Sequence, residues 1–540
     1  MVKEVSPAWI DNQNQLLTSA GYVEITCEII DPVAQNNASV SSLETAYFSD
    51  TESVTTSNRI ETVPVGTLEW NFWTLDGTYE IPVNTTDKVS NWGYAGTDSV
   101  VSMTFPEVMA NPIPGIVITW GKSYGEYAES FDVVFLNGSD VLQTVSVRDN
   151  DSLEYLIEIP MQNYDRIEIR ILSWSIPNRR YRIEKITLGW SVTFTKNDIM
   201  SYKHSSTADP ISGVLPKNSV DFTLNNFDNK WDISNAKSFA KYLIERQRVT
   251  TRYGFDINGS VEWIKGGVFY LHEWKVASNN LSVRFVARDA FEFMIDQPYQ
   301  TDGAEKTLYE HCVSAIEQSD IHVDYVIDER LKNYSTAVLD DYSTAEILQY
   351  CANAVGDGIY QDRDGILHIC DITISDDIVY PIYKMMQYEH PETELSKPLG
   401  SVIVTYANGA SYTSGIGVTG LKQTLRNEFI SNRDQAEIVA EKTRNYLGIR
   451  DTMTSNYRAD PRLDVFDTVR LYTKNNIYEL LVSEITYTFN GGFRGHVKGK
   501  CKLGADVSLD ITDDGNGNVT ITASVGVSIT DDGNGNVTIG

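Results

Sequence analysis

The feature that most constrains the fold is a run of short segments between residues 46 and 194. Apolar and polar residues alternate in SVVSMTF (99–105), GIVITW (115–120), FDVVFL (131–136), VLQTVSV (141–147), LEYLIEI (153–159), RIEIRIL (166–172) and YRIEKITL (181–188). Each segment has the period of two that turns one face of a strand toward a core. Turns rich in Gly, Asn and Asp, such as LNGSD, separate the segments. About seven strands at this spacing, without a helix, predict a β-sandwich or jelly roll.

The chain around this region predicts a mainly β, multidomain protein. Alternating segments resume after residue 194 and continue to about residue 300. The strand GYVEITCEII (21–30) has no partner nearby, so we assign it to that later region. The sequence therefore predicts a first β-barrel-like domain from residues 1–45 plus 195–300, with the jelly roll of residues 46–194 inserted into it.

The second half of the chain predicts a small α+β domain and a second β-barrel-like domain. In residues 301–385, TLYEHCVSAIEQ and STAEILQYCANAVG place apolar residues at helical spacing, and Ser343 with Glu346 matches a capping box. Asp364-Gly365 predicts the turn of a hairpin in the same unit. Residues 386–505 predict strands crossed by one helix at 433–448.

The chain ends on a repeat, because ITDDGNGNVTI at 511–521 returns at 529–539. Asp514, Asn516 and Asn518 have the spacing of the first three ligands of a calcium loop. The loop also requires a Gly and a bidentate Glu, and Val519 and Val525 stand at those positions. Two β-hairpins that share an apolar face fit residues 506–540 better. A face this small needs cover from another chain or domain.

Composition excludes several classes of protein. The 540 residues include 44 Lys and Arg against 74 Asp and Glu, a net charge of -30, which argues against a surface that neutralises phosphate backbones and against nucleic-acid specificity. Five widely spaced cysteines give neither a disulfide framework nor a zinc ribbon. The first residues, MVKEVSPAWIDNQNQLL, lack the apolar core of a signal sequence, and no apolar run approaches the length of a membrane span. We therefore expect a protein that is made and kept in a reducing cytoplasm, or that leaves the cell by lysis.

Enzyme signatures are also missing from the sequence. The seven histidines are scattered without an HExxH motif, and no GxSxG turn is present. The many carboxylates single out no glycosidase pair. We expect no enzymatic activity, no metal site and no cofactor.

The aromatic residues of the jelly roll suggest a binding role. Sugar recognition needs aromatic rings for stacking and polar neighbours for hydroxyl groups. Core packing explains aromatic residues on strand patterns, whereas rings beside turns are candidates for an exposed rim. The candidate carbohydrate-binding residues are Trp73, Trp92, Tyr94, Trp174, Asn178 and Arg179.

Several stretches resemble hub proteins of bacteriophage tail tips and baseplates, including the hub part of tail-associated lysins. They are SVTFTKNDIMSYKHSSTADPISGVLPKNSVDFTLNNFDNKWD, YLIERQRVTTRYGF, WIKGGVFYLHEW, ILQYCANAVGDGIYQDRDGILHI and ADPRLDVFDTVRLY. LEWNFWTLDGTYEIP and RIEIRILSWSIPNRRYRIEKITLGW are similar to discoidin-like, galactose-binding-type insertions of phage tail proteins. The resemblance covers about residues 20–505.

The resemblance implies a homotrimeric ring that caps the tail tube, in a virion assembled in the host cytoplasm. Its partners would be the tail tube, distal tail or tape-measure proteins, other tail-tip components and host wall polysaccharide. Lysin-bearing members continue into a peptidase or muramidase, where this chain has only the repeat. A distal tail protein, a virion carbohydrate-binding adhesin and a cell-wall hydrolase are the alternative functions.

Overall fold

The computed structural model describes most of the chain. The described residues are 3–15, 17–42, 60–64, 78–82, 90–94, 100–121, 125–177, 180–232, 235, 238–278, 280–338, 341–372, 379–382, 390–415, 419–473, 476–503, 507–513, 519–525, 529–531 and 537–539.

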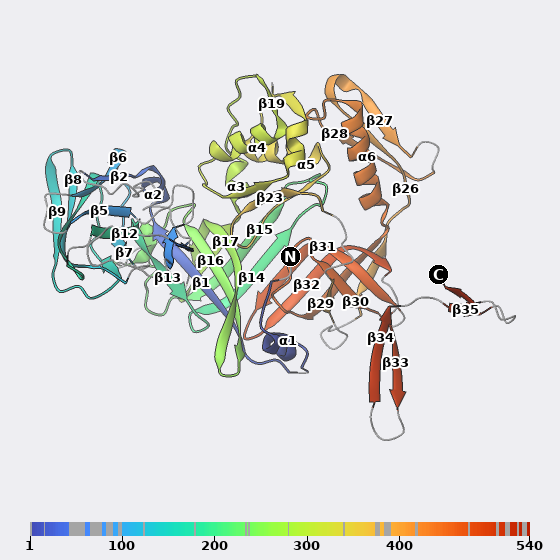
Figure 1. Cartoon of the computed structure of the whole chain (residues 1–540), viewed down its shortest axis with the longest axis horizontal. Helices are drawn as coiled ribbons and strands as arrows, with labels where there is room; N and C mark the ends of the chain where they lie inside the picture. The colour runs from blue at the N-terminus through green and yellow to red at the C-terminus, as the bar shows by residue number, and fades with distance from the viewer. Residues whose placement is uncertain are drawn as a thin grey trace.

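One sheet of thirteen strands joins the two β-rich halves of the chain (Figure 1). Its first-half strands follow the order β13 (Gly189–Phe194), β1 (Gly21–Ile30), β16 (Arg248–Ile257), β17 (Ser260–Val276), β18 (Ser282–Arg288), β15 (Lys217–Asn225) and β14 (Ile199–Thr207). The path continues through β31 (Ile477–Phe489), β32 (Phe493–Leu503), β29 (Asp451–Arg458) and β25 (Glu392–Leu395). Two further strands, β24 (Val379–Ile382) and β30 (Thr468–Tyr472), attach beside β31. The antiparallel pairing of β14 with β31 makes the two halves one sheet.

Alternation along the strands explains which face of this sheet is buried. On β14 the even positions from Tyr202 to Ser206 are buried, and the odd positions from Ser201 to Thr207 are exposed or half-buried. The inner face packs into one hydrophobic core that contains residues of both halves, such as Phe222 and Tyr487. Helix α1 (Pro7–Gln13), capped by the Ser6 hydroxyl, adds Trp9 to that core.

Residues 31 to 188 leave and re-enter the large sheet at adjacent positions. β1 pairs with β13 and with β16, so the predicted placement of strand 21–30 beside the later β-rich region is confirmed. Ile30, at the end of β1, is the register partner of Gly189, at the start of β13. The change of sheet therefore falls near residues 30 and 189, so each change comes earlier in the chain than the boundaries predicted at 46 and 194.

The segment between those positions forms two packed sheets with a core of their own. One sheet contains β10 (Glu154–Ile157), β7 (Ile116–Trp120), β12 (Arg180–Thr187) and β5 (Ser90–Tyr94). The other contains β2 (Ser39–Ser42), β6 (Val101–Met109), β11 (Tyr164–Trp174), β8 (Ala128–Asn137) and β9 (Asp140–Val147). Helix α2 (Pro32–Asn37) leads into this β-sandwich, and β3 (Ile60–Pro64) pairs with β4 (Thr78–Pro82). Figure 1 shows the sandwich to one side of the large sheet.

The α+β region lies above the large sheet in Figure 1. Its helices are α3 (Ala290–Met294), α4 (Leu308–Glu317), η4 (Glu329–Asn333) and α5 (Thr344–Asn353), whereas η3 (Phe239–Tyr242) packs into the core of the large sheet. Its strands are β19 (Glu305–Thr307), β20 (Tyr325–Ile327), β21 (Ser335–Ala337), β22 (Gly358–Gln361) and β23 (Leu367–Cys370). The predicted capping box of Ser343 and Glu346 is confirmed at α5, and β22 and β23 form the predicted hairpin.

The helix predicted at 433–448 is confirmed as α6 (Arg433–Gly448), but it packs elsewhere than expected. It lies on the sheet of β27 (Ser411–Ser414), β26 (Leu399–Thr405) and β28 (Leu421–Arg426), near η6 (Ala407–Gly409). Its buried residues Ala436, Val439 and Ala440 belong to the same core as α4 and α5. The small buried residues of this helix therefore extend the α+β core, and strands β29 to β32 complete the large sheet without it.

The repeated end of the chain forms two hairpins, as predicted. They consist of β33 (Val507–Asp513) with β34 (Val519–Val525), and β35 (Ile529–Asp531) with β36 (Val537–Ile539). Figure 1 shows the first hairpin projecting away from the large sheet. The candidate calcium ligands Asp514, Asn516 and Asn518 lie outside the described residues. The fold is mainly β with several sheets, as the sequence predicts. None of the described helices has the length and apolar character of a membrane span.

Candidate functional site

Trp174, one of the predicted sugar-binding residues, lies in the core of the sandwich. Its side chain is only 6% exposed, and its indole Nε1 donates to Glu126 Oε2 at 2.9 Å. The ring meets Trp120 edge to face, with 5.9 Å between centroids. The register of β11 against β8 shifts at Ser173 and Trp174, next to the turn that suggested exposure. The expectation of an exposed Trp174 ring is therefore wrong, because the carboxylate satisfies its polar edge inside the core.

The structure describes the other predicted sugar-binding residues only in part. Trp92 and Tyr94 lie on β5, which pairs with β12, and Tyr94 is the register partner of Arg180. The side chains of these two residues, and all of Trp73, Asn178 and Arg179, lie outside what the structure describes. Trp92 and Tyr94 thus lie on one strand of the four-stranded sheet, whereas Trp174 lies on β11 in the five-stranded sheet.

A buried ion pair lies beside Trp174. Arg182 Nη1 is 3.1 Å from Glu126 Oε2, and the two side chains are 2% and 0% exposed. Breaking such a pair leaves a buried charge without compensation, so the two residues act as one structural unit with Trp174. No local pattern links them, since Glu126 and Arg182 are 56 residues apart.

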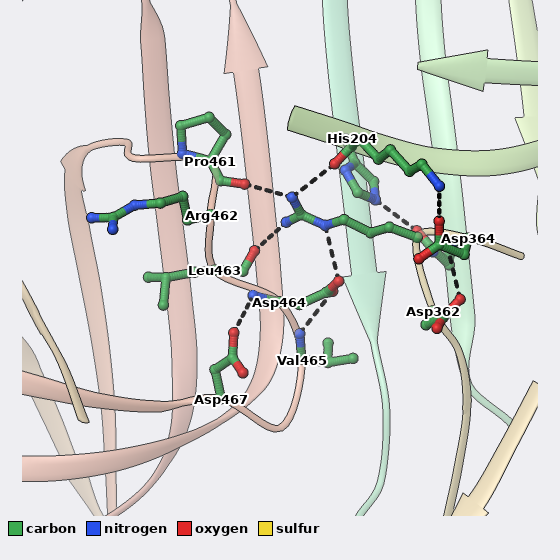
Figure 2. A network of polar contacts seen from close by, with 12 residues as sticks. His204, Asp362, Asp364, Pro461, Arg462, Leu463, Asp464, Val465 and Asp467 are labelled. Atoms are coloured by element: carbon green, nitrogen blue, oxygen red, sulfur yellow. Dashed lines mark hydrogen bonds and ion pairs between the residues drawn. The ribbon is translucent and has the colours of Figure 1, made fainter. Parts of the chain in front are cut away.

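A second polar cluster lies where the α+β region meets both halves of the large sheet. Arg363, in the turn between β22 and β23, is buried and ion-paired to Asp464 at 3.0 Å. Its guanidinium also donates to the carbonyl oxygens of Pro461 at 2.6 Å, Lys265 at 3.2 Å and Leu463. Figure 2 shows Pro461, Leu463 and Asp464 converging on this group. One side chain therefore connects three separate segments of the chain.

The charge state of Arg363 follows from these partners. Burial acts to lower the pKa of the guanidinium, but the Asp464 carboxylate and nearby groups hold that pKa above its ordinary value. The guanidinium is thus always protonated, and it bonds to Asp464 and to the three carbonyl oxygens. Sequence reasoning treated DRDG only as a turn, because the partners of Arg363 lie 98 to 101 residues away.

A chain of buried hydrogen bonds runs beside Arg363 through the first half of the sheet. Tyr202 and Tyr253 share a hydrogen bond of 2.7 Å, and the Tyr253 hydroxyl is 2.7 Å from His204 Nδ1. His204 Nε2 is 2.7 Å from Asn218 Oδ1. Burial, with the nearby charge of Arg363, lowers the pKa of His204 to about 4. His204 is therefore a neutral imidazole at physiological pH.

The same chain ends at a buried carboxyl group. The Asn218 backbone amide donates to Asp289 Oδ2 at 2.6 Å, and Asp289 caps α3 through the amide of Glu292. Burial raises the pKa of Asp289 to about 7, against the lowering effect of these two hydrogen bonds. The group is thus poised to titrate near neutrality as part of the fold.

These clusters join segments that are far apart in the chain through hydrogen bonds and ion pairs. Burial raises the pKa of the Cys27 thiol to about 12 and that of Cys370 to about 11, so neither is a ready nucleophile. Among the described residues, no group of three His, Cys, Asp or Glu side chains converges as metal ligands do. The polar groups of the Arg363 and His204 clusters bond to one another and to nearby carbonyl oxygens, which is the arrangement of a structural junction.

Solved structures similar to this chain include tail proteins of prophages. The 43 kDa tail protein of prophage MuSo2 from Shewanella oneidensis is 11% identical, with a TM-score of 0.41 over 57% of this chain and 94% of that chain. A tail protein from Neisseria meningitidis MC58 is also 11% identical, with a TM-score of 0.41 over 57% and 93%. Prophage tail protein gp18 from Listeria monocytogenes EGD-e is 9% identical, with a TM-score of 0.38 over 57% and 91%. No protein-family model and no curated protein matches the chain.

Proposed function

We propose that this chain is a structural component of a phage tail tip or baseplate. It would act in the virion, after assembly in the host cytoplasm, as a hub ring without enzymatic activity. The observation that carries the proposal is the pairing of β14 with β31, which merges the two β-rich halves into one sheet. The two β-rich halves form one joined scaffold, and Arg363 connects it to the α+β region. Such a scaffold suits a ring that transmits force between other proteins.

The parts of the molecule have separate roles in this proposal. The strands near residues 1–30 and 189–300, with those of 386–505, would form the two β-barrel-like units of the ring, and the α+β region of 301–385 would brace them. The sandwich would be an inserted discoidin-like jelly roll, and residues 506–540 would contact the next component. Proposed partners are two further copies of the chain, the tail tube, distal tail or tape-measure proteins and other tail-tip components.

Direct imaging tests the ring. Negative-stain class averages of the purified full chain should show a threefold ring with a central opening, because closed cyclic symmetry is the normal outcome of identical contacts. A sixfold ring would favour the distal tail protein instead. A monomer by light scattering at micromolar concentration, which forms no ring when tail-tube protein is added, would contradict the hub assignment.

The sandwich would bind host cell-wall polysaccharide through the strand that carries Trp92 and Tyr94. Trp92→Ala should then weaken binding to purified cell walls by about 1–3 kcal/mol, the loss expected for an aromatic stacking contact, and change the melting temperature little. Trp174→Ala is the matched comparison within the same domain. It removes a buried ring and should cost about 3–5 kcal/mol of folding free energy.

Pull-down on cell walls and thermal melting of both variants separate the two roles. Unchanged wall binding by the folded Trp92→Ala protein would remove this residue from the sugar site. A large fall in the melting temperature of the Trp92→Ala protein would mean that Trp92 packs in the core.

A further inference from the structure

The outer face of the large sheet carries an unusual concentration of positive charge across the seam between the halves. On β18, β15, β14, β31 and β32 we select seven charged residues near the seam and call them the basic sheet face; Arg288 of β18, which is ion-paired with Glu292, lies beside them. Its basic members are Lys203, Lys217, Arg284, Arg494 and Lys498, and its acidic members are Asp221 and Glu484. All are exposed or half-buried.

Strand register fixes how these cations are arranged. Lys203 on β14 aligns with Thr488 on β31, which aligns with Arg494 on β32. Four residues further along β14, Thr207 aligns with Lys217 on one side and with Glu484 on the other, and Glu484 aligns with Lys498. Strand spacing places Lys203 about 10 Å from Arg494, and Lys217 about 14 Å from Lys498. The four cations therefore lie at the corners of a flat patch of polar side chains.

Hydroxyl and imidazole groups lie between these four cations. Ser219, Ser205, Thr486 and His496 align in one row across the four strands. The hydroxyls of Ser205 and Thr486 lie 3.2 Å apart across the β14–β31 seam. Side chains of this kind donate hydrogen bonds to anionic oxygens.

The corner cations form no direct ion pair with a described residue, although Lys203 lies opposite Asp221 and Lys498 lies opposite Glu484 across the strands. Arg284 is paired with Asp221, which accounts for one carboxylate of the face. Lys203, Lys217, Arg494 and Lys498 form no ion pair with any residue that the structure describes. A hollow of about 250 Å³ opens beside Lys203, Lys217 and Arg284, with the carboxyl groups of Asp221, Asp289 and Glu292 also at its wall. The face is open to an outside anion.

The face also differs from a protein interface. Stable protein interfaces have an apolar or aromatic centre. Here the outward positions of β14, β15, β31 and β32 between the corners are Ser, Thr, Lys, Arg, His, Asp and Glu. The whole chain carries a net charge of -30, so the rest of its surface repels a polyanion and confines it to this region. The net charge predicts no phosphate-neutralising surface, but charge here is distributed unevenly.

We propose that the basic sheet face holds double-stranded DNA by its phosphate backbone, without reading its sequence. The cation separations of about 10–14 Å compare with the major-groove width of about 12 Å, so opposite corners can meet phosphates of both strands. Contacts of this kind release counter-ions and give weak, salt-dependent binding. The proposal does not depend on the oligomeric state or on a role in a phage tail.

The test is fluorescence anisotropy of a short fluorescein-labelled duplex with the purified full chain. With about four phosphate contacts, affinity should fall about a hundredfold between about 50 and about 200 mM NaCl. Replacing Lys203, Lys217, Arg494 and Lys498 by Gln should lower affinity at low salt by about tenfold or more and flatten this dependence. The matched control carries Gln at four exposed lysines elsewhere, Lys230, Lys332, Lys397 and Lys422. It has the same net charge and should bind nearly as the parent does.

Three outcomes would overturn the proposal. They are no binding by the parent at low salt, equal affinities of the two fourfold variants, and equal binding of polyglutamate at matched charge. The last would assign the face to an acidic protein. Thermal melting and light scattering check that each variant is folded, and the pair Lys203→Gln with Lys498→Gln replaces the fourfold variant if that does not fold.

Discussion

Arg363 connects three parts of the chain through one planar group, because a guanidinium can donate in several directions at once. Arg363→Met keeps most of the apolar stem but leaves Asp464 and the carbonyls of Pro461 and Leu463 without their donor. We expect a loss of about 3–5 kcal/mol in folding free energy, the usual cost of breaking a buried ion pair. Urea unfolding followed by tryptophan fluorescence measures it.

The control for this variant is Arg426→Met. Arg426 has a 75% exposed side chain paired with Glu428 on the surface, so its loss should change stability by less than about 1 kcal/mol. Equal effects of the two substitutions would mean that the Arg363 junction does not hold the regions together.

Asp289 predicts a pH effect whose sign is set by burial. Its pKa is raised to about 7 in the folded protein from an ordinary value of 3.8, so the folded state retains a proton that the unfolded state has released. This contribution to stability is present below about pH 4 and is lost as pH rises to about 7. Asp289→Asn removes the titrating group but keeps only one of its two acceptor oxygens, so its stability relative to the parent should rise by roughly 2–4 kcal/mol between those pH limits. Denaturant unfolding at several pH values measures the difference.

An exposed carboxyl gives the opposite sign in the same experiment. The Ala304 amide, followed by Lys306, lowers the pKa of Asp302, so Asp302→Asn should lose stability relative to the parent as pH rises. A flat difference for Asp289→Asn would show that its carboxyl is ionised in the fold at all these pH values.

At the scale of elements, local signals were predictable and distant partners were not. The Ser343–Glu346 capping box, the helix at 433–448 and the hairpin at Asp364-Gly365 depend on residues a few positions apart, and the structure contains all three. The burial of Trp174 depends on Glu126, and the packing of α6 depends on α4 and α5. Neither partner is marked in the sequence around the residue concerned.

The pairing of β1 with β13 gives a prediction about the sandwich. Because Ile30 and Gly189 are register partners, an Asn-Gly turn can replace residues 31–188 and close β1 and β13 as a hairpin. The shortened protein should be soluble and fold cooperatively, since the large-sheet core and the sandwich core are separate clusters. Circular dichroism and thermal melting test this. An insoluble product under conditions that keep the parent soluble would mean that the sandwich is needed for the remaining fold.

At the scale of the whole molecule, the repeated end predicts a role in assembly. The first hairpin pairs over seven residue positions and projects from the large sheet (Figure 1). A two-stranded hairpin is only marginally stable alone, so it should be covered by another component. Deleting residues 506–540 should preserve the ring in class averages and weaken attachment of the next tail component, with chelators having no effect on assembly. Infectious particles at normal yield from the truncated chain would show that the repeat is dispensable.

The attachment of the sandwich also determines how it responds to tension. Among the described strands β13 is an edge strand that pairs with β1 alone, with Trp190 and Phe194 packed against Phe239 and Trp231, whereas β1 also pairs with β16 on its other side. A pull on the sandwich therefore peels β13 from Gly189 toward Phe194, breaking the ladder one pair at a time while β1 stays in place. Peeling needs far less force than sliding whole strands past one another. The sandwich can thus swing outward on a lengthening tether under mechanical stress, and the central sheet keeps its shape.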